Sequence, residues 1–493
     1  MPCALAELVL TQDHLKLEEN FKFGGGATAT QIHPAVLVAM LVAILLLWLL
    51  PRRYVVIPFL MIAFLAPFGQ EVNVAGMHFY VLRIVILGGL VRLLAAKLQS
   101  KERLFQGTAR SIDKLFCLWA LVRATAFVLL YREGSAVANQ VAFLLDSLGG
   151  YFLLRYMIQD EEDIARVAKV LGVIVAVLGV CMLTERVRGI NVFGFFGTVS
   201  LIPTIRDGQI RAQGPFGHPI LAGTFGATLV PLFFWLWTSG KARAAAVTGF
   251  LGSTAMVLAS VASTSAMAYA AGISALGLWP LRRHMRMVRW GIVLTLLGMA
   301  LVMKAPVWFV IAHIDLTGAS SGWHRATLID LFIRNFGDWW LIGTDNFHKW
   351  GYDMWDTSQQ FVAEGENGGL VTLVCFIAII STCFSRLGKA RKLVEGGDRK
   401  QEWFFWSLGA VLFAHVVAFF GISYWDQTRM WWFAFLAMVS AATASVGATP
   451  AKIEVVTKDY LPNSVKLEPS RLGSGTLRGG RSGGSGSEAT PSY

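Results

Sequence analysis

Long apolar segments separated by short polar ones recur along most of the 493-residue chain. Each is long enough to cross about 30 Å of hydrocarbon as a helix. The segments are continuous, whereas membrane-spanning strands would alternate apolar and polar residues over a shorter length. The pattern therefore predicts about thirteen transmembrane helices, give or take one or two. They lie near residues 34–51, 54–69, 78–96, 114–131, 136–157, 164–183, 217–238, 245–262, 265–280, 287–303, 366–385, 403–422 and 429–447.

The composition strengthens this prediction. Hydrophobic residues make up 55% of the chain and charged residues 15%, and the mean hydropathy is +0.56. A soluble domain with a single membrane anchor would not be this apolar along its whole length. We therefore expect an all-α fold, namely a polytopic integral membrane protein with about 12–13 transmembrane helices.

The basic residues are not spread evenly. The formal net charge of +12 could by itself indicate a nucleic-acid partner. Lys and Arg instead gather in every second gap between apolar segments, as they do in cytoplasmic loops. Topology explains the excess, so no nucleic-acid partner is expected. The gaps expected on the outer side are 70–77, 132–135, 184–216, 304–365 and 422–428, which are poorer in basic residues or balanced by acids.

The two ends of the chain differ from its apolar middle. Residues 1–33 lack a basic region followed by an apolar stretch and a small-residue cleavage site, so they do not resemble a signal peptide. Thirteen spans would place this N-terminal segment outside and the C-terminus in the cytoplasm. Residues 448–493 are rich in Gly and Ser and poor in aromatics, which predicts a disordered cytoplasmic tail. Residues 34–447, including both long outer loops, then form the transmembrane domain.

The first long outer loop, 184–216, leads into a helix through "RAQGPFGHPILAGTFG". Its Arg211 and the following His218 are expected at the outer mouth of that helix. A helix start offers unpaired N–H groups to an anion, and Arg211 adds a bidentate phosphate donor. Two alternatives remain open: Arg211 could anchor the helix to lipid headgroups, and His218 could form a hydrogen bond at the helix start without a role in catalysis.

The second long outer loop, 304–365, is too long for a plain connection. Within it "GWHRATLIDLFIRNF" has apolar residues at helical spacing, which predicts an amphipathic helix that starts near Arg325. This helix could lie on the membrane surface or pack on the bundle. Tryptophans and carboxylates follow, and they suit either an aromatic belt at headgroup depth or a sugar-binding surface. The histidines of the loop do not have the spacing of metal ligands, so no metal is expected.

Three charges fall inside predicted membrane helices, namely Arg83, Arg123 and Asp146. A charge at this depth needs a partner or a polar cavity, and an ion pair between Arg123 and Asp146 is the simplest arrangement. The sequence has no convincing internal repeat, and its polar residues gather in the outer loops. This favours chemistry at the outer face over transport through the middle of the bundle.

The order of these elements resembles that of the O-antigen ligase and polymerase superfamily of bacterial envelope glycosyltransferases. The resemblance covers roughly residues 200–385 and rests most on the motif R-x-x-G-x-x-x-H-P, here Arg211, Gly214, His218 and Pro219. A large loop follows that opens with "SSGWHR" and closes with "EGENGGL". The resemblance implies a multi-pass protein of the bacterial inner membrane, with its active site and a large helix-bearing loop facing the periplasm.

Members of this superfamily take a glycan from an undecaprenyl diphosphate carrier and join it to another glycan or to lipid A core. The resemblance implies that Arg211 and Arg325 bind the diphosphate. Breaking the sugar–diphosphate bond builds negative charge on the leaving group, which fixed guanidinium groups stabilise. The arginines supply the positive charge, so no metal or cofactor is expected. Besides the lipid-linked donor, the implied partners are the growing polysaccharide acceptor, membrane lipids, a flippase and a chain-length regulator.

The sequence departs from the ligase pattern at one place. Ligases commonly carry a His-Asn or similar pair about nine residues before the "E-x-G" ending, whereas "DTSQQFVAEGENGG" has Thr357 and Ser358 there. The general base that takes the acceptor proton is then open among Asp356, Glu364, Glu366 and His348, and we favour Asp356 and Glu366. The residues expected in catalysis are Arg211, Arg325, Asp356 and Glu366, and those expected to contact substrate are His218, His324, His348, Trp355 and Glu364.

Three functions follow from these features. The missing histidine favours a polymerase of exopolysaccharide or O-antigen repeat units over a ligase that acts on lipid A core. A flippase or transporter of lipid-linked glycans is the third interpretation. The resemblance also implies an inverting single displacement, in keeping with the lack of a residue that stands out as a covalent nucleophile.

Overall fold

The computed structural model describes residues 30–444, apart from 75–76, 100–110, 315–321, 352–353 and 355. The predictions for residues 1–29 and for the tail 448–493 lie outside the described residues. The α-helices are α2 (Pro34–Leu49), α3 (Val56–Leu65), α4 (Val81–Gln99), α5 (Ser111–Tyr131), α6 (Gly134–Leu144), α7 (Gly150–Met157), α8 (Glu161–Arg188), α9 (Pro219–Ser239), α10 (Arg243–Ser260), α11 (Ser263–Gly277), α12 (Met285–Val302), α13 (Gly322–Arg334), α14 (Phe336–Trp339), α15 (Gln360–Leu393), α16 (Arg399–Phe419) and α17 (Gln427–Ala442).

Shorter elements connect these helices. A π-helical turn, η3 (Leu145–Gly149), joins α6 to α7, and the 3-10 helices are η2 (Arg52–Tyr54), η4 (Val192–Phe196), η5 (Trp279–His284), η6 (Val307–His313) and η7 (Phe347–Lys349). Two antiparallel hairpins that the sequence pattern does not predict are β1 (Glu71–Val74) with β2 (Met77–Tyr80) and β3 (Thr204–Arg206) with β4 (Gln209–Arg211). The turn of the second hairpin is Asp207-Gly208, and both residues have positive φ, as a two-residue hairpin turn requires.

The protein is mostly helical, and each of the thirteen predicted apolar segments contains a helix. Within the described residues, seven helical segments are long and apolar enough to cross a membrane: Ser111–Tyr131, Gly134–Met157, Glu161–Arg188, Pro219–Ser239, Trp279–Val302, Gln360–Leu393 and Arg399–Phe419. The other predicted spans are shorter or more charged as helices. For example, α3 has 10 residues, and α4 carries Arg83, Arg92 and Lys97.

The centre of the bundle contains α9 and α17, whose residues are nearly all buried. Nearly all residues of α9 are buried, as expected for a helix that is apolar on every side. Glycines allow α8 and α10 to pack with their backbones close together, because a Cβ at Gly179 would lie 2.7 Å from the Gly252 carbonyl oxygen. Small residues at such contacts are typical of helix packing in membranes.

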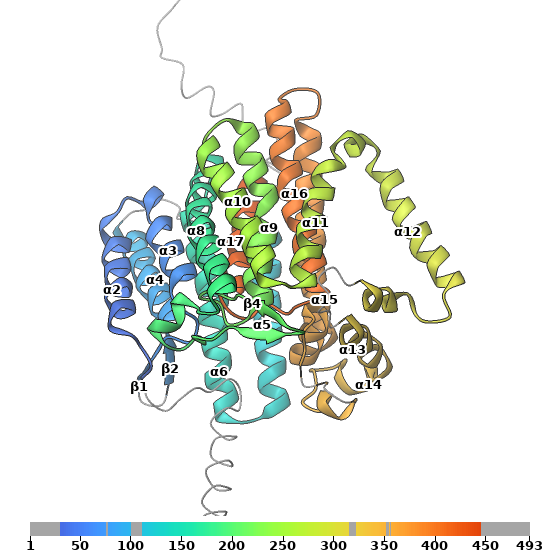
Figure 1. Ribbon diagram of the computed structural model, residues 1–493, viewed down its shortest axis with the longest axis horizontal. Helices are drawn as coiled ribbons and strands as arrows, with labels where there is room; N and C mark the ends of the chain where they lie inside the picture. Colours follow the sequence, from blue (N-terminus) through green and yellow to red (C-terminus); the bar gives the residue numbers. More distant parts are fainter. Residues whose placement is uncertain are drawn as a thin grey trace, which may run out of the picture. The chain divides into compact units, whose positions relative to one another are not determined.

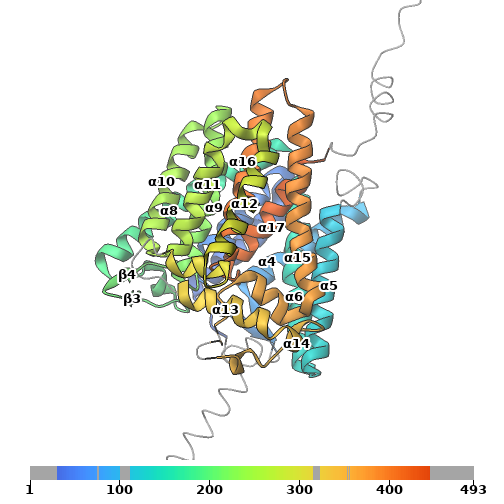
Figure 2. The same ribbon diagram turned by 90° about the vertical axis from the view of Figure 1, so that its right-hand side faces the viewer.

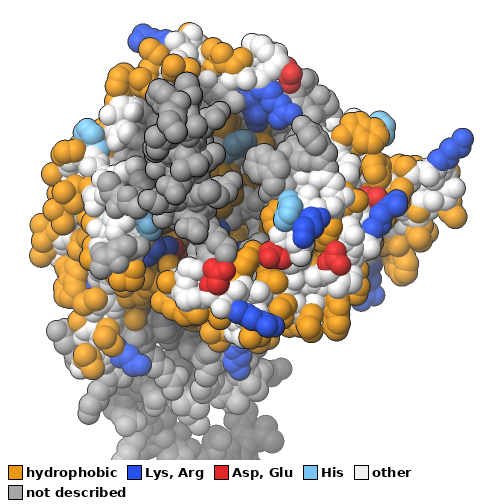
Figure 3. Space-filling view, turned by 90° about the horizontal axis from the view of Figure 1, so that it is seen from below, with side chains coloured by type: hydrophobic (Ala, Val, Ile, Leu, Met, Phe, Trp, Pro, Cys, Tyr) orange, Lys and Arg blue, Asp and Glu red, His pale blue; other side chains and the backbone are white. Residues whose placement is uncertain are grey.

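The loops meet at two opposite ends of the bundle (Figures 1 and 2). At the lower end in Figure 1 lie the loops predicted to be outer, together with both hairpins, α13 and α14. Hydrogen bonds join these loops: Phe68 N–H donates to the Pro215 carbonyl at 2.8 Å, and Gly217 N–H donates to Asp426 Oδ2 at 3.0 Å. We call this the outer-loop end. Figure 3 views it directly and shows acidic, basic and histidine side chains among apolar ones.

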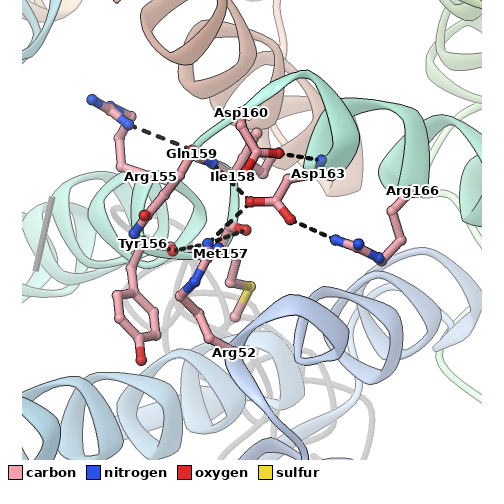
Figure 4. Close-up of polar contacts among 9 residues, drawn as sticks. All are labelled: Arg52, Arg155, Tyr156, Met157, Ile158, Gln159, Asp160, Asp163 and Arg166. Carbon is pink, nitrogen blue, oxygen red and sulfur yellow. Dashed lines mark hydrogen bonds and ion pairs between the residues drawn. The ribbon is translucent and has the colours of Figure 1, made fainter. Parts of the chain in front are cut away.

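The basic gaps of the sequence meet at the opposite end, where several of their cations are paired with acids. Arg52 of η2 donates to Asp163 at 3.0 Å and to the carbonyls of Tyr156 and Met157, which ties the α2–α3 turn to the start of α8 (Figure 4). Asp163 also pairs with Arg166. The alternation of basic and less basic gaps along the sequence thus corresponds to two spatially separate ends.

The predicted ion pair between Arg123 and Asp146 is wrong. Asp146 instead binds Arg83 of α4 through two hydrogen bonds, Nε–Oδ1 at 2.9 Å and Nη2–Oδ2 at 2.6 Å. Arg123 lies over the ring of Phe143, with its Cζ 4.4 Å from the ring centroid. Neighbouring positions in the sequence could not show which face of each helix turns toward which neighbour.

One long helix is separate from the rest. α12 has no buried residue and lies away from the other long helices at the right of Figure 1. It leads through η6 to α13, the amphipathic helix that the sequence predicts, and α13 packs on η6 and α15. Its apolar side, with Leu328 and Phe332, forms a small core with Trp339, Met354 and Val362.

Candidate functional site

Arg211 ends strand β4, directly before the turn into α9. Its side chain is buried, and its Nε donates to the Ser260 carbonyl at 3.4 Å. The next residue, Ala212, donates its N–H to the Ala259 carbonyl at 3.0 Å. The hairpin is thus attached to the last turn of α10, where helical carbonyls lack partners within the helix. This attachment holds the Arg211 guanidinium at the outer-loop end.

The turn between Arg211 and α9 is fixed by backbone contacts. Gly214 has φ +58°, and the Glu185 carboxylate accepts hydrogen bonds from the N–H groups of Gln213 and Gly214 at 3.0 and 2.9 Å. His218 then caps α9, because its Nδ1 accepts from Ile220 N–H at 3.1 Å. The predicted hydrogen-bonding role of His218 at the helix start is confirmed.

Arg325 lies in the first turn of α13. Its side chain is 2% exposed, and its Nε has no hydrogen-bond partner among the described residues. The apolar core on the other side of α13 fixes this orientation. Leaving a guanidinium N–H buried and unpaired costs free energy, so its position needs another explanation.

Arg206, Arg211 and Arg325 lie close enough to affect one another electrostatically, and we call them the arginine cluster. Burial lowers the pKa of Arg325 to about 10; Asp356 opposes this shift, and Arg206 and Arg211 contribute to it. Burial and then Arg206 also lower the pKa of Arg211. Burial, with Arg211, Arg325 and Arg206 after it, lowers the pKa of His218 to about 4, which keeps this residue neutral.

The cluster has little negative charge to balance it. Within the described residues neither Arg211 nor Arg325 forms an ion pair with a carboxylate within 4.0 Å, and the acids that act on them are Asp207 and Asp356. Like charges held together in a buried site are costly unless an anion joins them. The arrangement is therefore suited to binding a group with more than one negative charge.

The segment 356–358 connects this cluster to α15. Asp356 is exposed, and its carbonyl oxygen receives a hydrogen bond at 2.9 Å from His324 Nε2. Thr357 donates to Glu366 Oε2 at 2.7 Å, while Glu366 Oε1 is buried and has no hydrogen-bond partner in the part of the chain that the structure describes. Thr357 thus links Asp356, its neighbour in the chain, to Glu366.

A kink in α15 fixes Glu366. Gly369 has φ +72° and interrupts the helix, and Leu370 N–H donates to the Trp340 carbonyl instead of bonding within the helix. Thr344 N–H donates to the Glu366 carbonyl at 2.9 Å. Segment 340–344 therefore inserts against the kink and separates the first turns of α15 from its long apolar part.

Glu364 faces the opposite way, into a cavity of about 200 Å³. Its oxygens accept from Trp119 Nε1 at 2.8 Å and Gln360 Nε2 at 2.7 Å. Arg123 and Arg429 also line this cavity, which α5, α15, α16 and α17 surround. We call it the inner cavity. The sequence analysis gave no role to Arg429, although an arginine at the start of an apolar segment was a signal that could have found it.

The predicted site residues fall into three groups. Arg211, Arg325, His218 and Asp356 come together in the arginine cluster, with His324 beside Asp356, and Thr357 joins Glu366 to them. Glu364 belongs to the inner cavity. His348 is exposed in η7, where its ring contacts Phe347, and Trp355 lies outside the described residues.

The described residues contain no group of three or more His, Cys, Asp or Glu side chains that could hold a metal ion. Comparison with known proteins gives no match, either to protein-family models or to curated proteins. The site must therefore be interpreted from its own geometry.

Proposed function

We propose that this protein is a glycosyltransferase that polymerises lipid-linked oligosaccharide repeat units. In this proposal the helices span the bacterial inner membrane several times, and the outer-loop end faces the periplasm. The donor is a glycan on undecaprenyl diphosphate, and the acceptor is the growing exopolysaccharide or O-antigen chain. The seven long apolar helices and the concentration of paired cations at the opposite end support this topology.

The observation that carries the proposal is the arginine cluster. Two buried guanidinium groups that have no carboxylate within 4.0 Å among the described residues repel each other, and a diphosphate would neutralise them. Their position at the outer-loop end suits a lipid whose headgroup lies at the membrane surface. Arg211, in the motif that resembles the superfamily, ends β4, and Arg325 comes from the second long loop.

The reaction would be a single displacement at the anomeric carbon. As the sugar–diphosphate bond breaks, negative charge grows on the leaving group, and the fixed guanidinium groups of Arg211 and Arg325 stabilise it. The exposed carboxylate of Asp356, beside Arg325, would take the proton of the attacking acceptor hydroxyl. Glu366, bound by Thr357, would orient the segment that carries Asp356. Such a step inverts the anomeric configuration.

The test uses purified protein with an undecaprenyl diphosphate-linked repeat unit from its own host, and products are followed by size. We expect a ladder of lengthening chains from the wild type, and no ladder from Arg211→Ala or Arg325→Ala. Arg334→Ala is the matched control, because Arg334 lies on the same helix but is exposed and paired with Asp330. It should polymerise like the wild type.

Two outcomes would overturn the proposal. A single addition to purified lipid A core with no chain growth would make the protein a ligase. Binding of the lipid substrate with no new glycosidic bond under any condition would favour a flippase or transporter. Retention of anomeric configuration would contradict the single displacement.

A further inference from the structure

The inner cavity contains two arginines that the proposed reaction does not use. Arg123 comes from the middle of α5 and Arg429 from the first turn of α17, and both line the cavity of about 200 Å³. Charges this deep in an apolar helical bundle are costly and mark functional sites unless they are paired. The question is whether their surroundings already provide the pairing.

The nearby acids are all bound by other groups. Asp146 is held by Arg83, and Asp426 accepts from the N–H groups of Gly217 and Thr428. Glu364 accepts from Trp119 and Gln360. Of the two arginines, Arg429 has one hydrogen bond, from its Nε to the Tyr424 carbonyl at 3.2 Å.

Arg123 lies against aromatic rings and has no polar partner in the described part of the chain. Its guanidinium lies over the Phe143 ring, and its buried Nε has no hydrogen-bond partner among the described residues. Among the described residues, Glu364 is the one carboxylate that lines the cavity beside the two guanidinium groups. The charged side chains of this lining therefore sum to a net positive charge.

The other residues that line the cavity indicate which kind of molecule would carry the anion. Trp119, Trp425 and Trp432 line the cavity, together with the polar residues Asn367 and Ser423. Aromatic faces stack on the apolar faces of sugar rings, while amides and hydroxyls bind sugar hydroxyls. The volume is below the roughly 300 Å³ at which pockets for drug-sized ligands begin, so one ring fits better than a whole oligosaccharide.

We propose that the inner cavity is a subsite for one acidic sugar of the glycan, whose carboxylate binds Arg123 and Arg429. This proposal rests on the proposed function for the identity of the ligand as a glycan. A carboxylate supplies the one negative charge that the cavity lacks and matches the fork of a guanidinium. A diphosphate carries more charge and suits the arginine cluster instead. In this proposal the carboxylate of the sugar and the diphosphate leaving group bind at two different sites.

The test measures binding, which does not depend on turnover. The purified full chain in detergent is titrated with methyl glucuronide, methyl galacturonide, methyl glucoside and inorganic pyrophosphate, and tryptophan fluorescence reports occupancy because three tryptophans line the cavity. We expect at least one of the two uronides to bind saturably and at least tenfold more tightly than the neutral glucoside. Pyrophosphate should compete with neither uronide.

Variants assign the binding to the cavity. Arg123→Gln and Arg429→Gln should each weaken uronide binding at least tenfold, whereas Arg211→Gln should leave it unchanged and weaken pyrophosphate binding. Arg289→Gln, on the exposed helix α12, is the control with the same chemical change. Glu364→Gln should strengthen uronide binding, because it removes a like charge; a misfolded protein could not give this result.

The proposal fails if the neutral glucoside binds as tightly as both uronides, if pyrophosphate displaces the uronide, or if the Arg123, Arg429 and Glu364 variants leave uronide affinity unchanged. These failures are distinct from failure of the polymerase. Uronide binding without chain growth would overturn the proposed function and keep the subsite, and chain growth without uronide selectivity would do the reverse.

Discussion

Several arginines at the two ends of the helical bundle differ in whether a carboxylate lies beside them. At the end shown in Figure 4, Arg52 and Arg166 share Asp163, and nearby Arg282 and Arg391 share Glu402 at 3.0 and 2.7 Å. At the outer-loop end, Arg211 and Arg325 are more deeply buried than Arg52, yet the described residues give them no carboxylate within 4.0 Å.

This difference separates structural arginines from those available for a ligand. A guanidinium that already shares a carboxylate has its charge and hydrogen bonds satisfied, so it joins helices together. A buried guanidinium without a partner lowers the free energy of unfolding, and a bound anion would offset this cost. Neither the net charge of the chain nor the positions of its basic gaps distinguish these two kinds of arginine in the sequence.

The largest effect is expected at the arginine cluster of the outer-loop end. Arg325→Met keeps most of the side-chain volume and removes the charge, so chain growth should fall by about 10²–10³-fold, as when one transition-state donor is lost. The free energy of unfolding should stay the same or rise, because one of several like charges has gone. Product ladders and denaturant unfolding of the same preparation measure the two effects. Loss of activity together with loss of stability would mean that Arg325 is structural.

The paired end should behave in the opposite way. Asp163→Ala removes the carboxylate shared by Arg52 and Arg166 and should lower the free energy of unfolding by about 3 kcal/mol. The specific activity of the folded fraction should not change.

Asp160→Ala is a smaller change at the same place. The Asp160 carboxylate caps α8 by accepting from Asp163 N–H at 2.8 Å, so its loss should lower the free energy of unfolding by about 1 kcal/mol. A strong effect of Asp163→Ala on turnover would contradict the division between the ends.

The smallest expected effect is the dependence of stability on pH at the outer-loop end. Burial raises the pKa of Asp426 to about 6, against the hydrogen bonds from Thr428 and Gly217. A folded-state pKa above the unfolded one means that the folded state holds more protons between about pH 4 and 6. Stability contributed by this group should therefore fall as pH rises through that window, by on the order of 1 kcal/mol. The loss of stability between pH 4.5 and 6.5, measured by thermal unfolding, should be smaller in Asp426→Asn than in the wild type.

Much of the fold could be predicted from the sequence. The thirteen apolar segments became helices because a continuous apolar run satisfies its backbone hydrogen bonds only within a helix when it packs among other helices. The helix around Leu328 and Phe332 followed from apolar spacing in the same way. The hairpin at Asp207-Gly208 was missed, although its Asp-Gly turn between residues that can extend was a usable signal.

The candidate site was only partly predictable. Arg211, Arg325 and His218 were selected through the motif and the loop order, and the structure brings them together. Arg123 was given the wrong partner, and Arg429 was missed. Both errors concern residues whose neighbours come from other helices, for example Trp119 and Glu364, which are 245 positions apart.

The sequence by itself determined which segments are helical and which gaps carry the cations, because these depend on local apolarity and charge. Only the tertiary structure decided which cations are paired. Pairing depends on which faces of distant helices meet, and a rotation of one helix by one residue changes every neighbour of a side chain. Arg83 therefore obtained Asp146, while Arg123 turned into a cavity beside Arg429.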